Sequence, residues 1–162
     1  GVQTCALPIW NLYGKKLKSK LILSGYNISF IETEGDNVKF MCQSGVINQG
    51  EIAETDYKVN VYFDNFDNSI IKIHWRADGV GRNYDYTMLA NNRVKISNIG
   101  ISTIFPNETV NVIRFNFDIK KTKIEEVLSK LKIEFRLYYS NGEDIIETDL
   151  IDYYNDKLKK VI

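Results

Sequence analysis

The side chains that most often catalyse reactions or bind metals are scarce in this chain of 162 residues, whose formal net charge is zero. His74 is the single histidine, which excludes sites built from several histidines. In strand phase it points away from Ile73, towards solvent or a sheet edge, and a hydrolase based on it would need a carboxylate beside it in a cleft. Cys42 follows Phe40 and Met41 in a strand pattern, which favours a buried apolar role over a nucleophilic one. We therefore predict a protein that is not an enzyme and that holds no metal or cofactor.

Acidic and amide side chains gather in the turn region after Phe63 and in a later loop. They are Asp64, Asn65, Asp67, Asn68 and Asp78. Their oxygens suit calcium, but the spacing lacks the central glycine and the final bidentate glutamate of a helix–loop–helix calcium site. Residues 79–82, Gly-Val-Gly-Arg, lack the lysine and the helix start that a phosphate-binding loop needs. We interpret both stretches as turn and loop chemistry.

The candidate ligand-binding surface is aromatic and surrounds that glycine-containing loop. Trp75 precedes the loop, Arg82 lies in it, and Tyr84 and Tyr86 follow it. Such rings stack on a sugar, a base or a partner side chain, and arginine adds charge. The alternative interpretation is that Trp75 belongs to the core and that the tyrosines lie at a strand edge. These four residues form the candidate ligand-binding site.

A basic stretch lies near the start of the chain, where Tyr13 is followed by Lys15, Lys16, Lys18 and Lys20. An aromatic ring at the lipid headgroups, followed by lysines on the cytoplasmic side, is typical of the end of a membrane-spanning helix. No apolar run in the sequence approaches the ~20 residues that such a helix needs, so the helix itself would precede residue 10. The alternative is an edge strand whose lysines discourage edge-to-edge pairing. We interpret residues 10–20 as a juxtamembrane-like stretch.

Residues 1–9 resemble translated sequencing adapter rather than protein, and we exclude them from the fold. Their sequence, Gly-Val-Gln-Thr-Cys-Ala-Leu-Pro-Ile, reads codon by codon as the end of a common short-read adapter. The last adapter base would open the next codon, so Trp10 need not be the natural residue. With Cys5 set aside, Cys42 has no disulfide partner. We expect a fragment whose natural N-terminal part, and any membrane helix in it, is missing.

The elements that must position these residues are mainly strands. Apolar and polar residues alternate between turns in a way that predicts eight or nine short strands. The expected strands cover residues 21–30, 38–42, 57–63, 70–75, 84–89, 93–97, 110–119, 133–139 and 145–148. Residues 43–55 are polar and predict a loop. Gly25 predicts a bulge, Asn91-Asn92 a tight turn and Asn141-Gly142 a hairpin.

Two helices are expected among the strands. Thr122 and Glu125 form a capping-box pattern, and the apolar spacing after them predicts a short connecting helix at about residues 122–131. Apolar residues at looser helical spacing predict a further helix near the C-terminus, within residues 149–160. The chain does not alternate strands with helices as a parallel α/β sheet does. Residues 21–162 therefore predict a single all-β domain, an antiparallel β-sandwich.

Three short patterns resemble small bacterial immunoglobulin-like sandwich proteins. They are a strand ending in Phe63-Asp64-Asn65, the Ile-rich strand at 70–73, and the turn Pro106-Asn107-Glu108-Thr109 before the strand at 110–115. The turn after Phe63 is longer and more acidic here than is usual in those proteins. Many of them carry one N-terminal membrane helix, a short aromatic-then-lysine junction and a sandwich without an assigned function. The resemblance implies an immunoglobulin-like β-sandwich anchored in the membrane by the missing N-terminal helix.

These observations lead to two hypotheses about function. The first is a non-enzymatic, membrane-tethered interaction or assembly module that binds an unknown protein partner, with the domain on the cytoplasmic side. The second is a soluble β-sandwich that binds carbohydrate or nucleic acid through the aromatic loop region. The balanced charge makes nucleic acid an unlikely partner, because the chain has no excess of basic residues. An extracellular lipoprotein and a soluble cytoplasmic protein are the alternative locations.

Overall fold

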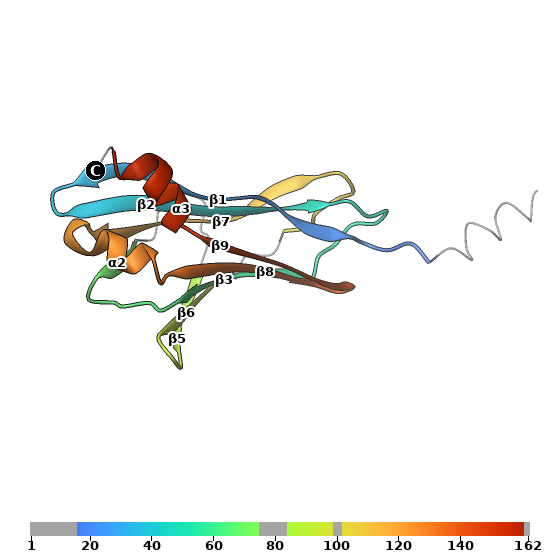
Figure 1. Ribbon diagram of the computed structural model, residues 1–162. Coiled ribbons are helices and arrows are strands. Elements are labelled where there is room, and N and C mark those ends of the chain that lie inside the picture. The colour runs from blue at the N-terminus through green and yellow to red at the C-terminus, as the bar shows by residue number, and fades with distance from the viewer. Residues whose placement is uncertain (1–15, 75–83, 99–101, 161–162) are drawn as a thin grey trace, which may run out of the picture.

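Two antiparallel sheets stacked face to face form a β-sandwich in the computed structural model, which describes residues 16–74, 84–98 and 102–160 (Figure 1). The first sheet has the order β1-β2-β7-β4 and the second the order β5-β6-β3-β8-β9. The first contains β1 (Leu21–Glu34), β2 (Asn37–Asn48), β4 (Ile71–His74) and β7 (Thr109–Lys120). The second contains β3 (Tyr57–Asp64), β5 (Tyr84–Leu89), β6 (Arg93–Asn98), β8 (Lys132–Tyr139) and β9 (Gly142–Asp149). The predicted all-β sandwich is confirmed.

The two long sides of the sandwich differ. On one side, β1 contacts both β8 and β9, and the backbone N–H of Leu23 donates to Oδ2 of Asp144 at 2.9 Å. On the other side lie the edge strands β4 and β5, and residues of both line one pocket. We call this the β4–β5 side.

The helices are short and cover the ends of strands. A 3₁₀ turn η1 (Lys121–Lys123) and α2 (Ile124–Leu128) connect β7 to β8, and α3 (Ile151–Tyr153) continues into a π-helical turn η2 (Tyr154–Leu158). Both predicted helices are therefore present, and Ile124, Leu128 and Leu131 are buried. The predicted capping box is wrong. The residue before α2 is Lys123, which makes no side-chain cap, because η1 occupies the turn that Thr122 was expected to begin.

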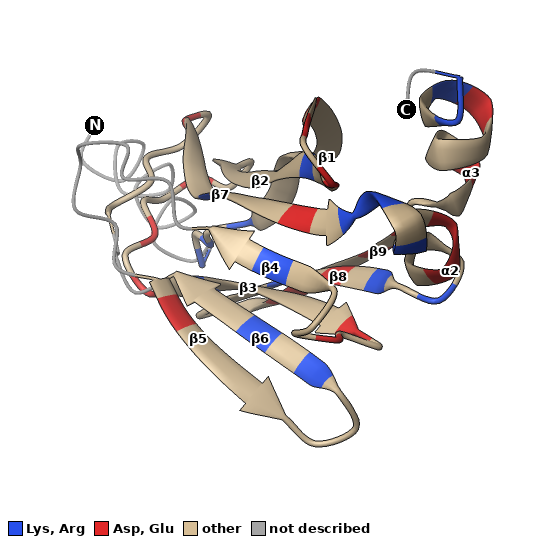
Figure 2. Ribbon diagram, turned by 90° about the vertical axis from the view of Figure 1, so that its left-hand side faces the viewer, with Lys and Arg blue, Asp and Glu red and all other residues tan. Residues whose placement is uncertain are grey.

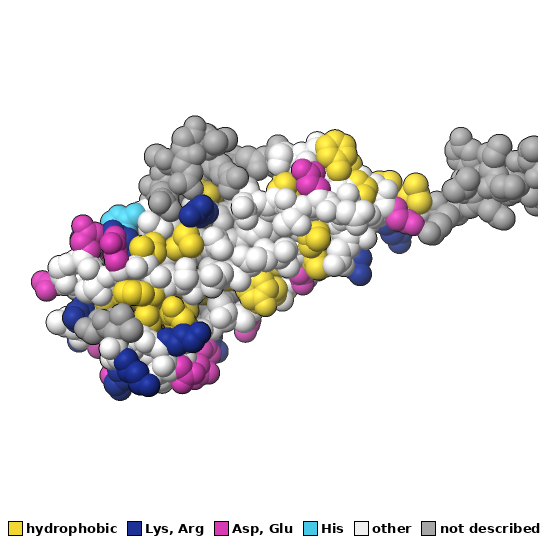
Figure 3. Space-filling model, turned by 90° about the horizontal axis from the view of Figure 1, so that it is seen from above, with side chains coloured by type: hydrophobic (Ala, Val, Ile, Leu, Met, Phe, Trp, Pro, Cys, Tyr) yellow, Lys and Arg dark blue, Asp and Glu magenta, His cyan; other side chains and the backbone are white. Residues whose placement is uncertain are grey.

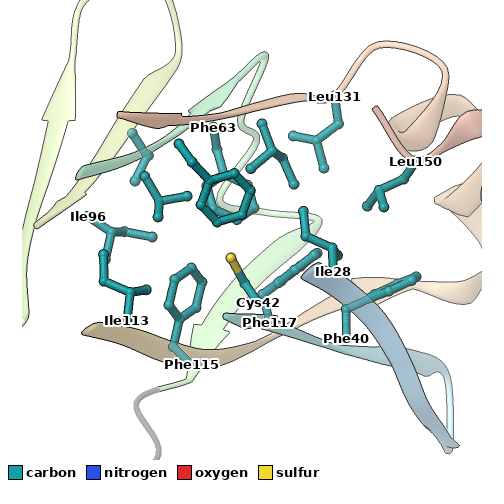
Figure 4. Packing of buried hydrophobic residues seen from close by; sticks show 14 of the residues in the cluster. Ile28, Phe40, Cys42, Phe63, Ile96, Ile113, Phe115, Phe117, Leu131 and Leu150 are labelled. Atoms are coloured by element: carbon teal, nitrogen blue, oxygen red, sulfur yellow. The ribbon is translucent and has the colours of Figure 1, made fainter. Parts of the chain in front are cut away.

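A single apolar cluster fills the space between the sheets (Figure 4). The ring of Phe63 meets that of Phe117 edge-on at 5.2 Å, and Phe117 stacks on Phe40. These residues come from β3, β7 and β2, where strand alternation directs every second side chain inwards. Cys42 lies in the same cluster, and burial raises the pKa of its thiol, so the predicted apolar role is confirmed.

The predicted loop at 43–55 is wrong over its first half, because β2 continues to Asn48. A Cβ on Gly45 would lie 2.9 Å from the carbonyl oxygen of Val110 and 3.0 Å from that of Ser24. The strand β2 pairs with β1 on one side and with β7 on the other. Its neighbours leave room only for a small residue at Gly45, and Ser44 and Asn48 are buried. Local hydrophobicity does not reveal such a strand.

The predicted turns form. The register of β1 shifts between Ser24 and Asn27 around Gly25, whose φ is +59°. Asn91 and Asn92 have φ of 59° and 55°, values that asparagine tolerates better than most residues. Acidic and basic residues occur on strands of both sheets (Figure 2). Among the described helices, none has the length and apolar character needed to cross a bilayer.

Candidate functional site

Two of the predicted juxtamembrane lysines, Lys18 and Lys20, are hydrogen-bonded through their backbone carbonyls to one end of the sandwich. The backbone N–H of Gln49 donates to the carbonyl of Lys20 at 2.8 Å, and that of Glu51 donates to the carbonyl of Lys18 at 3.0 Å. Lys16, Lys18 and Lys20 are exposed, and Ser19 between them is buried. The ordered fold therefore begins before the predicted boundary at residue 21. Tyr13 and Lys15 lie outside the described residues.

Gly50 allows the lysine segment to pass this close. A Cβ at Gly50 would lie 2.4 Å from the backbone nitrogen of Lys20 and 2.5 Å from the carbonyl oxygen of Lys18. Both atoms belong to backbone, which yields less easily than a flexible side chain. The close packing of residues 18–20 on residues 49–51 therefore requires glycine here.

The buried carboxylate of Glu54 binds the lysine segment through Ser19. Oε2 of Glu54 accepts hydrogen bonds from the hydroxyls of Ser19, at 2.6 Å, and Ser140, while Oε1 accepts from the backbone N–H groups of Thr55 and Asp56 at 3.1 Å. Burial by itself would raise the pKa of Glu54, but these hydrogen bonds outweigh it and lower the pKa. The network joins Ser19 to the β8–β9 hairpin, and Asn141 also donates to the Ser19 hydroxyl at 2.8 Å.

Asn48 connects the remaining segments at this end. Its Oδ1 accepts from the backbone N–H of Gly50 at 2.8 Å, and its Nδ2 donates to the carbonyls of Ile52 at 2.8 Å and Ile104 at 3.0 Å. We call the assembled residues 16–20, 48–54, 104–108 and 140–141 the N-terminal end. It lies at the right of Figure 1, away from α2 and α3.

The structure describes two of the four predicted ligand-binding residues. Trp75 and Arg82 lie outside the described residues. The hydroxyl of Tyr84 accepts a hydrogen bond from the backbone N–H of Arg114 at 2.9 Å, which ties β5 to the opposite sheet. Tyr86 is exposed, and burial of part of its ring raises the pKa of its hydroxyl. Of this pair, only Tyr86 presents a ring to the surface for binding.

His74 lies on the edge strand β4 and is half-exposed, as predicted, but it has a partner that the sequence did not reveal. The carboxylate of Asp118 accepts a hydrogen bond from Nε2 of His74, with 2.8 Å between the atoms. Asp118 is 8% exposed on β7, and its other oxygen has no hydrogen-bond partner within the part of the chain that the structure describes. Finding this pair requires the β4–β7 register, which places His74 opposite Asn116 and next to Asp118.

Two pockets lie on the β4–β5 side. The smaller, of about 390 Å³, includes His74, Lys72, Phe66 and Tyr86 in its lining. The other, of about 500 Å³, lies between the turn after β3, the β5–β6 hairpin and α2, and includes Phe66 and Met88. None of the described residues in the smaller pocket's lining is serine, threonine or cysteine. The His74–Asp118 pair therefore adjoins a pocket in which Tyr86 supplies the hydroxyl group among those residues.

The acidic residues after β3 make turn and surface contacts, as predicted. Asp64 lies 2.9 Å from Nε of Arg93. Oδ1 of Asp67 accepts hydrogen bonds from the hydroxyl and the backbone N–H of Ser69, which lower the pKa of Asp67. Over residues 16–74, 84–98 and 102–160, no three histidine, cysteine or acidic side chains gather as metal ligands. Asp78 and the Gly-Val-Gly-Arg stretch lie outside these ranges.

A further polar cluster covers the outer face of the second sheet and has no local sequence signal. Arg93 lies over the ring of Tyr62, with its guanidinium carbon 4.3 Å from the ring centroid. Arg93 and Arg136 both contact Glu134, at 3.3 and 3.0 Å. The members come from β6, β3 and β8, so the cluster depends on strand order. The charged groups of the cluster pair with one another through charge-assisted hydrogen bonds.

Comparisons with known proteins find weak likenesses to solved structures. No protein-family model and no curated protein matches the chain. AvmM, which catalyses macrocyclization in alchivemycin A biosynthesis, matches over 76% of this chain and 86% of its own, with 15% identity and a TM-score of 0.39. An uncharacterized β-sandwich protein from Clostridium difficile 630 matches over 82% and 86%, with 12% identity and a TM-score of 0.33. A β-N-acetylglucosaminidase from Vibrio harveyi matches over 80% of this chain but 17% of its own, with 9% identity and a TM-score of 0.37. Such low scores support no inference about function.

Proposed function

We propose that this chain is a non-enzymatic interaction module, tethered to a membrane on its N-terminal side, that binds a protein partner on its β4–β5 side. The observation that carries the proposal is the contrast between the two regions. Backbone hydrogen bonds attach the lysine segment to one end of the sandwich, whereas the exposed side chains of β5 and two pockets lie on the β4–β5 side. Such a module holds a partner at a fixed distance from the membrane.

The lysine segment supports the tether. Lysines that follow an aromatic residue are typical of the cytoplasmic end of a membrane helix. Because Gln49, Glu51 and Glu54 hold residues 18–20, the part of this segment that the structure describes is attached to the sandwich. We propose the cytoplasmic side on the same ground, since lysine-rich junctions remain there. A lipoprotein signal in the natural protein would move the domain to the outer surface.

Exposed side chains on the edge strand β5 support the proposal that a partner binds on the β4–β5 side. Tyr86, Met88 and Leu89 are exposed on this edge strand, and pockets adjoin Tyr86 and Met88. Tyrosine and methionine are enriched at protein interfaces, because they offer large contact areas and adapt to a partner's shape.

The coding sequence upstream of residue 10 tests the tether. The proposal expects an apolar span of about 20 residues directly before the lysine segment. A natural start codon with no apolar span, or a cleavable signal peptide, would refute the cytoplasmic tether. Photocrosslinking from position 88 in cells tests the partner site, with position 143 on β9 as a matched exposed control. A crosslinked protein from both positions alike would refute a specific site at β5.

Binding of a small ligand is a second candidate, favoured by the position of Tyr86 beside Lys72 and His74 in one pocket. A tyrosine ring next to a cation and a hydrogen-bonding imidazole suits a carbohydrate or a base. Glycan and oligonucleotide binding should then be lost in Tyr86→Ala and in Trp75→Ala. Unchanged binding in both variants would exclude this site.

A further inference from the structure

Three large apolar side chains are exposed at the N-terminal end. Phe105 is 60% exposed, Leu17 is 47% exposed and Ile52 is 39% exposed. They come from the segment before β1, the loop after β2 and the loop before β7, which are far apart in the sequence. Exposed apolar residues that gather at one place often mark a contact surface.

Hydrogen bonds hold the three segments that carry these side chains together at one end. Asn48 binds the carbonyls of Ile52 and Ile104, and Glu51 binds the carbonyl of Lys18, next to Leu17. Phe105 opens a turn that continues through Pro106 and Asn107, whose φ is 65°. Glu108 closes the turn from both sides, because its side chain accepts from the N–H of Phe105 at 2.9 Å and its N–H donates to the carbonyl of Phe105 at 3.0 Å. The ring of Phe105 is therefore presented by an ordered turn.

The lysine segment brings positive charge to the same end. Lys16, Lys18 and Lys20 are exposed, and the exposed side chain of Leu17 lies between the first two in the sequence. Exposed carboxylates at this end come from Glu51 and Glu108. In Figure 1 the lysine segment runs out beyond the strands, and Figure 3 shows hydrophobic, basic and acidic side chains together at this end.

We infer that the N-terminal end docks directly on an anionic phospholipid surface, with Leu17, Ile52 and Phe105 entering the headgroup region and Lys16, Lys18 and Lys20 contacting the lipid phosphates. Apolar side chains beside lysines are the combination that binds the interface of an anionic bilayer. Lysine stems also bury their methylene groups while the ammonium stays in the headgroups. This contact gives the sandwich a fixed orientation, with the β4–β5 side free for a partner.

The inference deepens the proposed function and rests on it for the choice of a membrane as occupant. An extended residue advances about 3.3 Å, so a membrane helix that ends near Tyr13 would bring residues 16–20 into reach of the headgroups. The loops that carry Ile52 and Phe105 are bonded to that segment or to its neighbour Asn48. The tether would thus place the same end against the lipid.

The test is co-sedimentation of the 162-residue chain, which contains no membrane helix among its described residues, with vesicles. Vesicles of phosphatidylserine and phosphatidylcholine in a ratio of about one to two should bind the chain at low salt, and pure phosphatidylcholine vesicles should bind it at least about tenfold more weakly. Binding should fall as salt rises, because screening shortens the range of the lysine charges.

Two variants locate the contact. Lys16→Gln, Lys18→Gln and Lys20→Gln together should weaken binding at least about tenfold, since each lysine near an anionic surface contributes about fivefold. Leu17→Ser, Ile52→Ser and Phe105→Ser together should weaken it by about tenfold or more while leaving the lysines in place. The matched control is Lys157→Gln, Lys159→Gln and Lys160→Gln, which removes the same charge from the C-terminal helix. Urea unfolding of each variant checks that the fold is retained.

The outcomes separate this inference from the proposed function. Equal loss in the control and in the N-terminal lysine variant would mean that only net charge matters and would overturn the docking surface. An absence of binding to anionic vesicles would overturn it as well. An apolar span upstream of residue 10 together with no vesicle binding would leave the tether standing and refute the docking. Vesicle binding without an upstream span would refute the tether and keep the docking.

Discussion

The N-terminal end and the β4–β5 side differ in whether the buried polar groups at or beside them have hydrogen-bond partners. At the N-terminal end, both carboxylate oxygens of Glu54 and both amide atoms of Asn48 have hydrogen-bond partners. On the outer face of β7, next to β4, buried atoms of Asp118, Asn116 and Arg114 have no partner among the described residues. A fully satisfied network fixes its segments in place, whereas unsatisfied groups leave binding capacity unused. We therefore expect substitutions at the first region to act mainly on stability, and at the second mainly on binding.

The largest expected effect comes from Glu54→Ala. Four donors would lose their acceptor, and one of these bonds is buried while the other three are partly buried, so the free energy of unfolding should fall by about 3 kcal/mol. Urea denaturation followed by circular dichroism measures the change. Glu143→Ala, at an exposed position on β9, is the matched control and should cost less than about 0.5 kcal/mol. Equal effects of the two substitutions would show that the Glu54 network does not hold the N-terminal end.

The pH dependence of the free energy of unfolding tests the same Glu54 network. The hydrogen bonds lower the pKa of Glu54 below its ordinary value of 4.5 in the folded protein. A carboxylate with a lowered folded pKa stabilises the protein above the unfolded pKa, and this stabilisation is lost as pH falls through the folded pKa. Unfolding measured from pH 6 to pH 3, values that bracket about 4.5, should show a smaller loss of stability in Glu54→Gln than in the unsubstituted protein. Parallel pH profiles would contradict the assigned network.

A smaller effect is expected for Gly50→Ala. The new Cβ would displace the backbone of Lys18 and Lys20, with an expected cost of about 2 kcal/mol. Hydrogen exchange measured by NMR should show faster exchange of the Gln49 and Glu51 amides, which donate to this segment. Gly142→Ala is the control, because its Cβ would approach Tyr139 no closer than 3.4 Å. Unchanged protection in Gly50→Ala would mean that residues 16–20 are not held as described.

His74→Ala should destabilise the protein less, by about 1 kcal/mol, because the imidazole is half-exposed and only one bond to Asp118 is lost. Lys72→Ala on the same strand serves as the control for losing an outward side chain of β4. Urea denaturation compares them. A cost as large as that of Glu54→Ala would remove the distinction between the two regions.

The smallest effect on stability is expected for the pair Tyr86→Ala and Met88→Ser on β5. Both side chains are exposed, so the free energy of unfolding should change by about 0.5 kcal/mol or less. Photocrosslinking to the partner from Leu89 should nevertheless be lost, since these side chains would form the contact. Crosslinking that persists in the double variant would place the partner site elsewhere.

The sequence predicted the sandwich but not the networks that distinguish its regions. Alternation around Val61 and Phe117, and turn residues such as Asn91, depend on neighbours in the chain, and these elements formed as expected. The Glu54 network joins residues 35 and 86 positions away from Glu54, and the His74–Asp118 pair spans 44 positions. Such contacts depend on strand order and register, which local patterns do not encode. The continuation of β2 through Gly45 was missed for the same reason, because the close approach of the neighbouring strands requires its small residues.

The most direct test of the two-region account is an NMR measurement on the chain bound to anionic vesicles that carry a paramagnetic label on the lipid headgroup. The account predicts broadening of amide signals from residues 16–20, 50–52 and 104–105, and unaffected signals from β4 and β5. Broadening centred on Tyr86, Met88 or α2 would contradict it, because the region assigned to the partner would then face the membrane.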